Sequence, residues 1–183
     1  LACNFACSYC FEKQHQNIFM SDAIENKIVN FISQHENAKL LNVTWFGGEP
    51  LLAFNRIVSL TRKMQALGLK YKAGMITNGY LLTEDIAKQL SSLSIDSVQI
   101  TIDGMASLHD SRRCLKSGQP TFETIIHNIE VLKALNPEIK LSVRVNVDNT
   151  NDKDFIELYK FFIEKHYHNF TLSLSFVKDL SGC

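Results

Sequence analysis

Hydrophobic and polar residues alternate along this chain with two periods, one typical of amphipathic helices and the other of buried strands. After Ser21, a suitable N-cap, apolar residues recur at helical spacing at Ile24, Ile28 and Phe31, which predicts a helix packed on the core to about residue 35. The same spacing predicts further helices over residues 52–67, 83–93, 121–135 and 151–165. Short apolar and β-branched runs predict buried strands over residues 40–46, 70–76, 96–102, 141–147 and 170–177.

Strands and helices therefore follow one another in strict alternation. Continuous apolar strands such as VQITI and LSVRV are typical of a parallel sheet that helices cover. Residues 105–120 read as a longer polar connection. The 183 residues are too few for a full eight-unit barrel, which needs about 250. The pattern predicts one α/β domain over residues 1–183, and an open doubly wound sheet remains an alternative topology.

Composition and charge exclude several classes of partner. The chain is 45% hydrophobic and 21% charged, and its 19 Lys and Arg residues are balanced by 19 Asp and Glu residues. A formal net charge of zero gives no electrostatic case for nucleic acid or an anionic membrane surface. No apolar run is long enough to span a bilayer, and the first residues do not resemble a signal peptide. We therefore expect a cytoplasmic protein without nucleic-acid or membrane partners.

The first ten residues carry the strongest chemical signal. Cys3, Cys7 and Cys10 have the spacing C-x3-C-x2-C on a segment too short to enclose an apolar core. Thiolates this close together can converge on one centre, and they are soft ligands that suit iron–sulfur clusters, zinc or cuprous ion. Because a cubane cluster has four irons, three cysteines would leave one iron open to another ligand, as in a catalytic metal site.

Two other interpretations of the cysteines stay open at this point. A structural zinc site needs four ligands, and the fourth would be His15, Cys114 or Cys183. A disulfide is the other, although the five cysteines are an odd number and 183 residues do not fit a small disulfide-rich scaffold. The spacing alone does not separate an open cluster from a zinc site.

Polar or glycine-containing groups follow four of the predicted strands, namely GGEP, TNG, IDG and NVDNTN. In parallel α/β folds, ligand-binding residues gather beyond the carboxyl ends of the strands, so these groups are expected to meet. Gly47 and Gly48 let a ligand approach the backbone closely. Glu49 offers an acceptor for an ammonium group, and Pro50 stiffens the turn.

In this order, the motifs resemble those of the radical S-adenosylmethionine (radical SAM) enzymes, whose signature is C-x3-C-x-aromatic-C. The resemblance covers nearly the whole chain and is to the group of anaerobic sulfatase-maturing enzymes and peptide maturases with C-terminal SPASM domains. It implies that Cys3, Cys7 and Cys10 bind a 4Fe–4S cluster, and that Tyr9 lies beside the adenine of S-adenosylmethionine. It also implies a partial (β/α)6 TIM-like barrel, here without its first strand.

The resemblance extends to the strand-end motifs. GGEP implies a site for the methionyl amino group, and TIDG looks like the family's S-x-D-G with threonine where serine is commoner. Threonine keeps the hydroxyl group, which can still contact the cofactor's carboxylate or ribose. Polar residues of the strand over residues 141–147 are expected to reach the same groups. The cofactor-binding residues implied in this way are Tyr9, Gly47, Gly48, Glu49, Pro50, Asn78, Thr101, Asp103, Arg144 and Asn146.

The polar connection matches a further pattern of this group, H-D-x-x-R followed by G-x-x-T-F. It contains His109, Asp110, Arg112 or Arg113, and Gly118. No role follows from this match, and no catalytic residue beyond the cluster is assigned. Outside these motifs, Cys114 is expected to be a free thiol, and His127 and His166 are expected on helix surfaces.

The resemblance implies a radical SAM enzyme, in which an electron from the cluster cleaves the cofactor to a 5′-deoxyadenosyl radical. That radical would abstract hydrogen from a peptide or protein substrate during post-translational maturation, with a flavodoxin- or ferredoxin-type protein as electron donor. Because the chain begins at Leu1 without an initiator methionine, we interpret it as the core of a longer protein, with a SPASM-type extension beyond Cys183. The alternatives are cofactor biosynthesis on a small molecule and a non-catalytic zinc or iron–sulfur module.

Overall fold

The architecture is taken from a computed structural model, which describes residues 2–10, 12, 18–35 and 37–177. The helices are α1 (Asp22–Ser33), the 3-10 turn η1 (Pro50–Ala53), α2 (Phe54–Gln65), α3 (Glu84–Ala87), α4 (Ala106–Arg112), α5 (Phe122–Leu135) and α6 (Phe155–Glu164). The strands are β1 (Leu40–Trp45), β2 (Lys70–Thr77), β3 (Ile95–Thr101), β4 (Lys140–Val147) and β5 (Phe170–Phe176).

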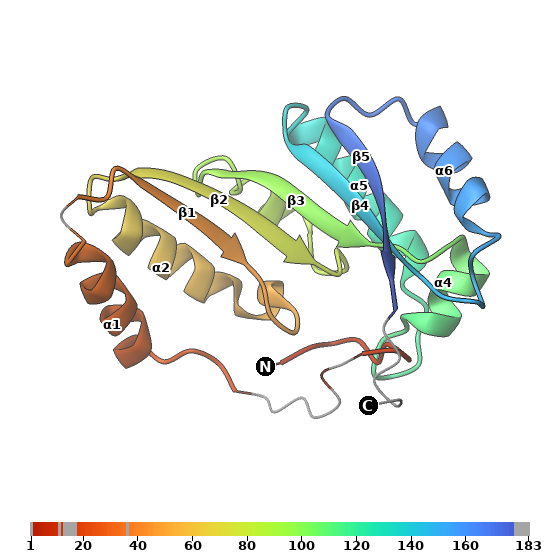
Figure 1. The fold of residues 1–183 in the computed structure, drawn as a ribbon, viewed down its shortest axis with the longest axis horizontal. Helices are drawn as coiled ribbons and strands as arrows, with labels where there is room; N and C mark the ends of the chain where they lie inside the picture. Colours follow the sequence, from red (N-terminus) through yellow and green to blue (C-terminus); the bar gives the residue numbers. More distant parts are fainter. Residues whose placement is uncertain (1, 11, 13–17, 36, 178–183) are drawn as a thin grey trace.

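The strands form a single parallel sheet in the order β1-β2-β3-β4-β5, which is their order along the chain. A doubly wound sheet would reverse its order at a switch point, so that alternative is excluded. Sequential parallel strands with helices on one side are the arrangement of a barrel wall, and the prediction of an open, partial barrel is confirmed. Figure 1 shows the N-terminal segment beyond the arrowheads that mark the carboxyl ends of the strands.

The two faces of the sheet differ in chemistry. On the helix-covered face, the apolar residues of β4 alternate with polar ones and are fully buried, as are their counterparts on β3. The opposite, concave face carries Ser97 and Gln99 of β3, which pair in register with Lys140 and Ser142 of β4. TIM-barrel interiors are normally filled by bulky branched side chains. Small hydroxyl-bearing residues such as Ser97 and Ser142 lie on this inner face instead, and a cavity of about 620 Å³ remains along it.

Two expectations about the N-terminal half are wrong. The first strand is an edge strand whose residues are at best half-buried, because in the described residues only β2 pairs with it. The apolar face predicted for α1 does not enter the core, since Ile24 and Phe31 are 45% and 63% exposed. The buried residue of α1 is instead Glu25, so polar contacts hold this helix in place.

The connections also differ from the predicted pattern. The helix expected over residues 83–93 is a single turn, α3, followed by turns up to Ser94, whose φ is +53°. The supposed polar loop of residues 105–120 contains α4, whose His109 and Arg112 are buried. The sequence predicted a loop here because the buried residues of this helix are polar, so the apolar periodicity typical of a helix is missing.

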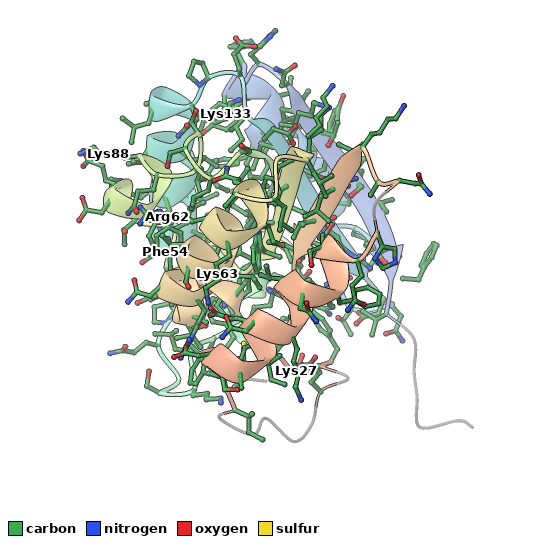
Figure 2. The ribbon with its side chains drawn as sticks, turned by 90° about the vertical axis from the view of Figure 1, so that its left-hand side faces the viewer. Lys27, Phe54, Arg62, Lys63, Lys88 and Lys133 are labelled. Atoms are coloured by element: carbon green, nitrogen blue, oxygen red, sulfur yellow. The ribbon has the colours of Figure 1, made fainter. Side chains whose placement is uncertain are left out.

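Glu25 ties α1 to α2 through its carboxylate. Oε2 accepts hydrogen bonds from Ser59 Oγ and Lys63 Nζ, both at 3.0 Å, and Oε1 accepts one from Arg56 Nη1 at 3.2 Å. The carboxylate is fully buried, whereas the two cations are more than a third exposed. Figure 2 shows α1 lying beside α2, with Lys63 labelled on α2.

We expect Glu25→Ala to lower the free energy of unfolding by about 1–3 kcal/mol, because three donors lose their acceptor while the two cations can still turn to water. Asp22→Ala is the matched control: Asp22 also pairs with Arg56, but its side chain is 77% exposed, so its loss should change stability by less than about 1 kcal/mol. Urea unfolding of both variants checks this. Equal losses would contradict the assigned role of Glu25.

Candidate active site

The cysteine segment is held against the segment that follows α4. Phe5 forms an antiparallel bridge with Leu115, flanked by hydrogen bonds from Ala6 N–H to the Cys114 carbonyl and from Lys116 N–H to the Asn4 carbonyl, both 2.9 Å. The Ser8 N–H donates to the Arg112 carbonyl at 3.0 Å and continues the same register. Residues 4–8 therefore run antiparallel to residues 112–116.

Phe5 is the apolar anchor of this pairing. Its side chain is 1% exposed, joins the hydrophobic core and packs edge-on against the ring of Tyr80 at a centroid distance of 6.0 Å. The Asn4 side chain adds a polar tie, because its Oδ1 accepts a hydrogen bond from Asn78 Nδ2 at 2.8 Å. These contacts fix the loop beside the carboxyl end of β2.

A cavity of about 530 Å³ opens between the cysteine segment and the strand ends. Its wall contains the three cysteines of the motif, Tyr9, and the first two glycines of GGEP. From the strand ends it receives Asn78, Thr101, Arg144 and Asn146. Seven of the ten residues predicted to bind the cofactor thus line one cavity, together with all three predicted cluster ligands.

Gly48 makes close contact between the GGEP turn and the cysteine segment. A Cβ atom at this position would lie 2.2 Å from the carbonyl oxygen of Ala2 and 3.4 Å from Cβ of Cys3. The same carbonyl accepts a hydrogen bond from the Glu49 N–H at 2.8 Å. Glycine is therefore needed here for packing between two loops, in addition to any contact with a ligand.

Glu49 and Pro50 stand behind the cavity wall. The Glu49 carboxylate accepts hydrogen bonds from Thr77 Oγ1 at 2.6 Å, from the Asn78 N–H at 2.7 Å and from the Leu51 N–H at 3.0 Å. Burial raises the pKa of this carboxyl, and the three hydrogen bonds oppose that rise. Glu49 joins the GGEP turn to the end of β2. A direct contact between Glu49 and the ammonium group of the cofactor stays a prediction. Pro50 begins η1.

The Tyr9 hydroxyl collects contacts from two distant elements. It accepts hydrogen bonds from Arg113 Nη1 at 2.5 Å and from Asn146 Nδ2 at 3.0 Å. Asn146 Oδ1 in turn accepts from Arg144 Nε at 3.2 Å, and Arg144 also donates to Ser175 Oγ on β5. Burial raises the pKa of Tyr9, which keeps it a neutral phenol. The ring predicted to lie beside adenine is thus locked in position.

Asp103 does not line the cavity but organises the residues that do. Its Oδ1 accepts a hydrogen bond from the Asn146 N–H at 3.0 Å, and its Oδ2 accepts one from Arg112 Nε at 3.4 Å. Arg112 also donates to Asp148 Oδ2 at 2.9 Å and to Thr150 Oγ1 at 2.7 Å. This buried network links the ends of β3 and β4 to the end of α4.

His109 completes a chain of hydrogen bonds behind the site. Its Nδ1 accepts from the Asp103 N–H at 3.3 Å, so Nε2 carries the proton and donates to Thr121 Oγ1 at 3.2 Å. Thr121 Oγ1 donates to the Arg113 carbonyl at 2.7 Å. Burial, and then the charge of Arg113, lower the pKa of His109 to about 3. The H-D-x-x-R and T-F pattern therefore has a structural role in holding residues 112–116.

Several residues of the cavity were missed by the sequence analysis. Arg113, Gln99 and Ser175 line it, as do the apolar Phe5 and Phe176. Gln99 could have been found from its inward position on a predicted strand. Ser175 and Phe176 depend on the register of β5 against β4, which the sequence does not specify. The roles of His15 and Cys183 lie outside the described residues, while Cys114 is free and His127 and His166 are exposed, as predicted.

The donor set suits an iron–sulfur cluster. Burial raises the pKa of the Cys3 thiol, and it raises that of Cys7 to about 11, with the charge of Arg113 acting in the opposite direction on both. Such thiols become thiolates only when a metal replaces the proton. Within the described residues, no group of three His, Cys, Asp or Glu side chains is placed to hold a single metal ion. A cubane spreads its cysteine ligands over different irons.

Comparisons with known proteins agree with this site. The sequence model of the family described as "Radical SAM superfamily" matches residues 1–162, and the chain belongs to that family. It is 30% identical to the serine-type anaerobic sulfatase-maturating enzyme of Bacteroides thetaiotaomicron over an alignment of 183 positions, which covers 92% of this chain and 43% of that protein. It is 27% identical over 176 residues to the cysteine-type enzyme of Clostridium perfringens, covering 90% of this chain and 46% of that protein.

Solved structures show the same likeness. "Native anSMEcpe with bound AdoMet" superposes with a TM-score of 0.83 and 26% identity, over 97% of this chain and 49% of that one. The same protein with bound AdoMet and the Cp18Cys peptide gives a TM-score of 0.81 and 27% identity, over 97% of this chain and 48% of that one.

The cofactors of the radical SAM superfamily, to which the chain belongs, are a 4Fe–4S cluster and S-adenosylmethionine. The chain spans about half the length of the curated relatives it matches. Within the described residues, no helix is both long and apolar enough to cross a membrane.

Gly48→Ala should reduce cluster assembly severalfold while secondary structure is kept, because the added Cβ displaces Ala2 and with it Cys3. Gly68→Ala is the matched control, since no atom lies within 4 Å of its Cβ position and the positive φ costs about 1–2 kcal/mol. Iron and sulfide content after anaerobic reconstitution measures the effect. Full iron content in the Gly48 variant would contradict the packing argument.

Protonation of His109 should destabilise the fold at acid pH. The folded pKa of about 3 lies below the unfolded value, so the unfolded state binds the extra proton and stability falls as pH drops from about 6.5 toward 3. The slope from this residue is about 1.4 kcal/mol per pH unit in that window. Urea unfolding of the iron-free chain should show this slope, and His109→Asn, which keeps an acceptor for the Asp103 N–H, should lack it.

Proposed function

We propose that the complete protein uses this site to abstract a hydrogen atom from a peptide or protein substrate, as in post-translational maturation. The observation that carries the proposal is that one cavity, at the carboxyl ends of the parallel strands, joins the three cysteines to the polar strand ends. When bound, the cluster supplies the electron that cleaves S-adenosylmethionine into methionine and the 5′-deoxyadenosyl radical. The peptide-bound structure of a similar protein supports the substrate class.

Different residues of this chain would bind different parts of the nucleotide. Tyr9, clamped by Asn146 and Arg113, offers an aromatic face for the adenine. Arg144 presents a guanidinium suited to a carboxylate, while Thr101 offers a hydroxyl beside it on β3. Gly47 and Gly48 leave room for the methionyl end next to Cys3. Glu49 and Asp103 would act indirectly, by fixing the turns that carry these groups.

The inner face of the sheet offers space for the substrate. A second cavity of about 620 Å³ is lined by inward-facing hydroxyls of four strands, at Thr44, Ser97, Ser142 and Thr171. Gln99 lines both cavities, so the two meet across β3. Hydroxyl and amide groups can pair with the backbone of an extended peptide, and enclosure keeps a reactive radical away from water. A substrate held here would lie next to the nucleotide site.

The remaining half of the protein would complete the substrate site. We infer that a SPASM-type extension follows residue 183 and that a flavodoxin- or ferredoxin-type protein donates the electron, as the resemblance to sulfatase-maturing enzymes implies. We also infer a cytoplasmic location, because thiols that must bind a cluster need a reducing compartment. These inferences concern the complete protein, of which this chain is the cofactor-binding portion.

The test is made on the full-length protein, reconstituted anaerobically and supplied with dithionite and S-adenosylmethionine. We expect 5′-deoxyadenosine to form, and we expect Cys7→Ala to abolish it because one cluster ligand is lost. Liquid chromatography of the nucleoside product measures both. A wild-type yield no higher than that of the Cys7 variant would refute radical SAM chemistry.

The substrate class is tested with peptides that carry a deuterated cysteine or serine. If the peptide is the hydrogen donor, deuterium should appear in 5′-deoxyadenosine, and its amount should rise with peptide concentration. Mass spectrometry of the nucleoside detects it. Nucleoside formation without deuterium transfer from any such peptide would instead favour a small-molecule substrate.

A further inference from the structure

Arg113 is a buried cation at the cavity wall, and it has few hydrogen-bond acceptors and no ion-pair partner among the described residues. Its side chain lines the cavity and the residue is 8% exposed. Its one side-chain hydrogen bond is to the Tyr9 hydroxyl, and its Nε atom is buried without a partner in the described residues. No carboxylate of that part of the chain forms an ion pair with it, in contrast to neighbouring Arg112, which pairs with Asp103 and Asp148.

A buried guanidinium in this position needs a negative charge. Transferring an unpaired charge out of water is costly, so buried charges are normally paired or face a metal centre. Tyr9 supplies only the dipole of a neutral phenol. The aromatic rings of Phe5 and Tyr9 also face the guanidinium, with their centroids 5.8 and 5.9 Å from its carbon atom. The carboxylates of Asp103 and Glu49 interact with Arg113 only at longer range, without a direct ion pair. The cavity therefore has room for an anionic group as the direct partner of this guanidinium.

The backbone register identifies the cysteine that lies nearest. Residues 4–8 run antiparallel to residues 112–116, with Phe5 opposite Leu115 and with hydrogen bonds that tie Ala6 to Cys114 and Ser8 to Arg112. Continuing this register places Cys7 opposite Arg113. Side chains of directly opposed residues in an antiparallel pair share one face and approach each other closely. The unpaired cation thus sits across from a predicted cluster ligand.

We propose that Arg113 is a positioning residue for the cluster, one that offsets the negative charge of its three thiolates and raises its reduction potential. Reduction adds one electron, taken from an external low-potential reductant, and makes the cluster more negative. A fixed positive charge stabilises that reduced form, and net charge is among the factors that set such potentials. The proposal rests on the cluster site of the proposed function.

Arg144 lines the same cavity but stands in a different environment. It lies on β4, and its guanidinium already donates to Asn146 and Ser175. The remaining N–H donors of the Arg144 guanidinium suit a contact with the nucleotide. Arg113 is therefore the guanidinium whose charge the cluster would feel before S-adenosylmethionine binds.

The test measures the cluster potential directly, by an EPR-monitored redox titration of the full-length protein without S-adenosylmethionine. Arg113→Gln should lower the ratio of reduced to oxidised cluster about tenfold at a given reductant potential, a shift of 59 mV for a one-electron couple. Arg113→Lys, which keeps the charge, should stay within about threefold of wild type. Tyr9→Phe, which removes the hydrogen-bond partner but keeps the charge, is the matched control and should also stay close to wild type.

Each outcome decides the matter. If Arg113→Gln keeps its cluster and its potential equals that of wild type, or if Tyr9→Phe shifts equally, charge compensation is refuted. If Arg113→Gln folds normally by circular dichroism but does not assemble a cluster, while Arg113→Lys does, the proposal is supported. Failure of Arg113→Lys to restore assembly and potential overturns it. Because the potential is measured without turnover, an inactive protein with a normal titration would refute only the proposed function.

Discussion

The pairing of residues 4–8 with residues 112–116 is the contact on which the site depends. The cysteine segment has no helix and no strand of the main sheet, and ten residues cannot form a core of their own. Burial of Phe5, worth about 1.5–3 kcal/mol for a side chain of this size, and the backbone hydrogen bonds beside it hold the segment at the strand ends. Gly48 then brings the GGEP turn against Ala2. Three thiols thereby come to share a cavity with residues from four strands.

The partner segment is itself fixed by buried polar contacts. Arg112 joins Asp103 at the end of β3 to Asp148 after β4, and His109 links the Asp103 backbone to Thr121 at the start of α5. These groups are costly to bury and give little stability beyond an apolar core, but their directional hydrogen bonds allow few alternative geometries. The cluster loop is therefore positioned by the same groups that close the barrel wall around the nucleotide.

The sequence predicts most of this arrangement because its strands are continuous apolar runs and its strand ends carry distinct motifs. Parallel topology, the shared edge and the meeting of Asn78, Thr101, Arg144 and Asn146 all follow from those two features. Sequence order alone does not show which residues merely support the site. Glu49 looks like a ligand residue, yet its carboxylate is engaged by three internal donors.

Two of the errors share one physical cause. Hydrophobic periodicity does not detect an element that is held by buried polar groups. Helix α4 was read as a loop because its buried residues are His109 and Arg112, and α1 was given an apolar face although it is held through Glu25. The importance of Arg113 was missed for a different reason, because its position depends on a pairing between segments more than a hundred residues apart.

The central claim is that the chain leaves one iron of a cluster free to bind the sulfonium nucleotide. The most direct measurement is the EPR spectrum of the reduced, full-length protein before and after S-adenosylmethionine is added. The account predicts a 4Fe–4S signal whose g-values change on addition, because the nucleotide binds an iron of the cluster. A spectrum that does not respond, or a protein that holds zinc at the three cysteines, would contradict it.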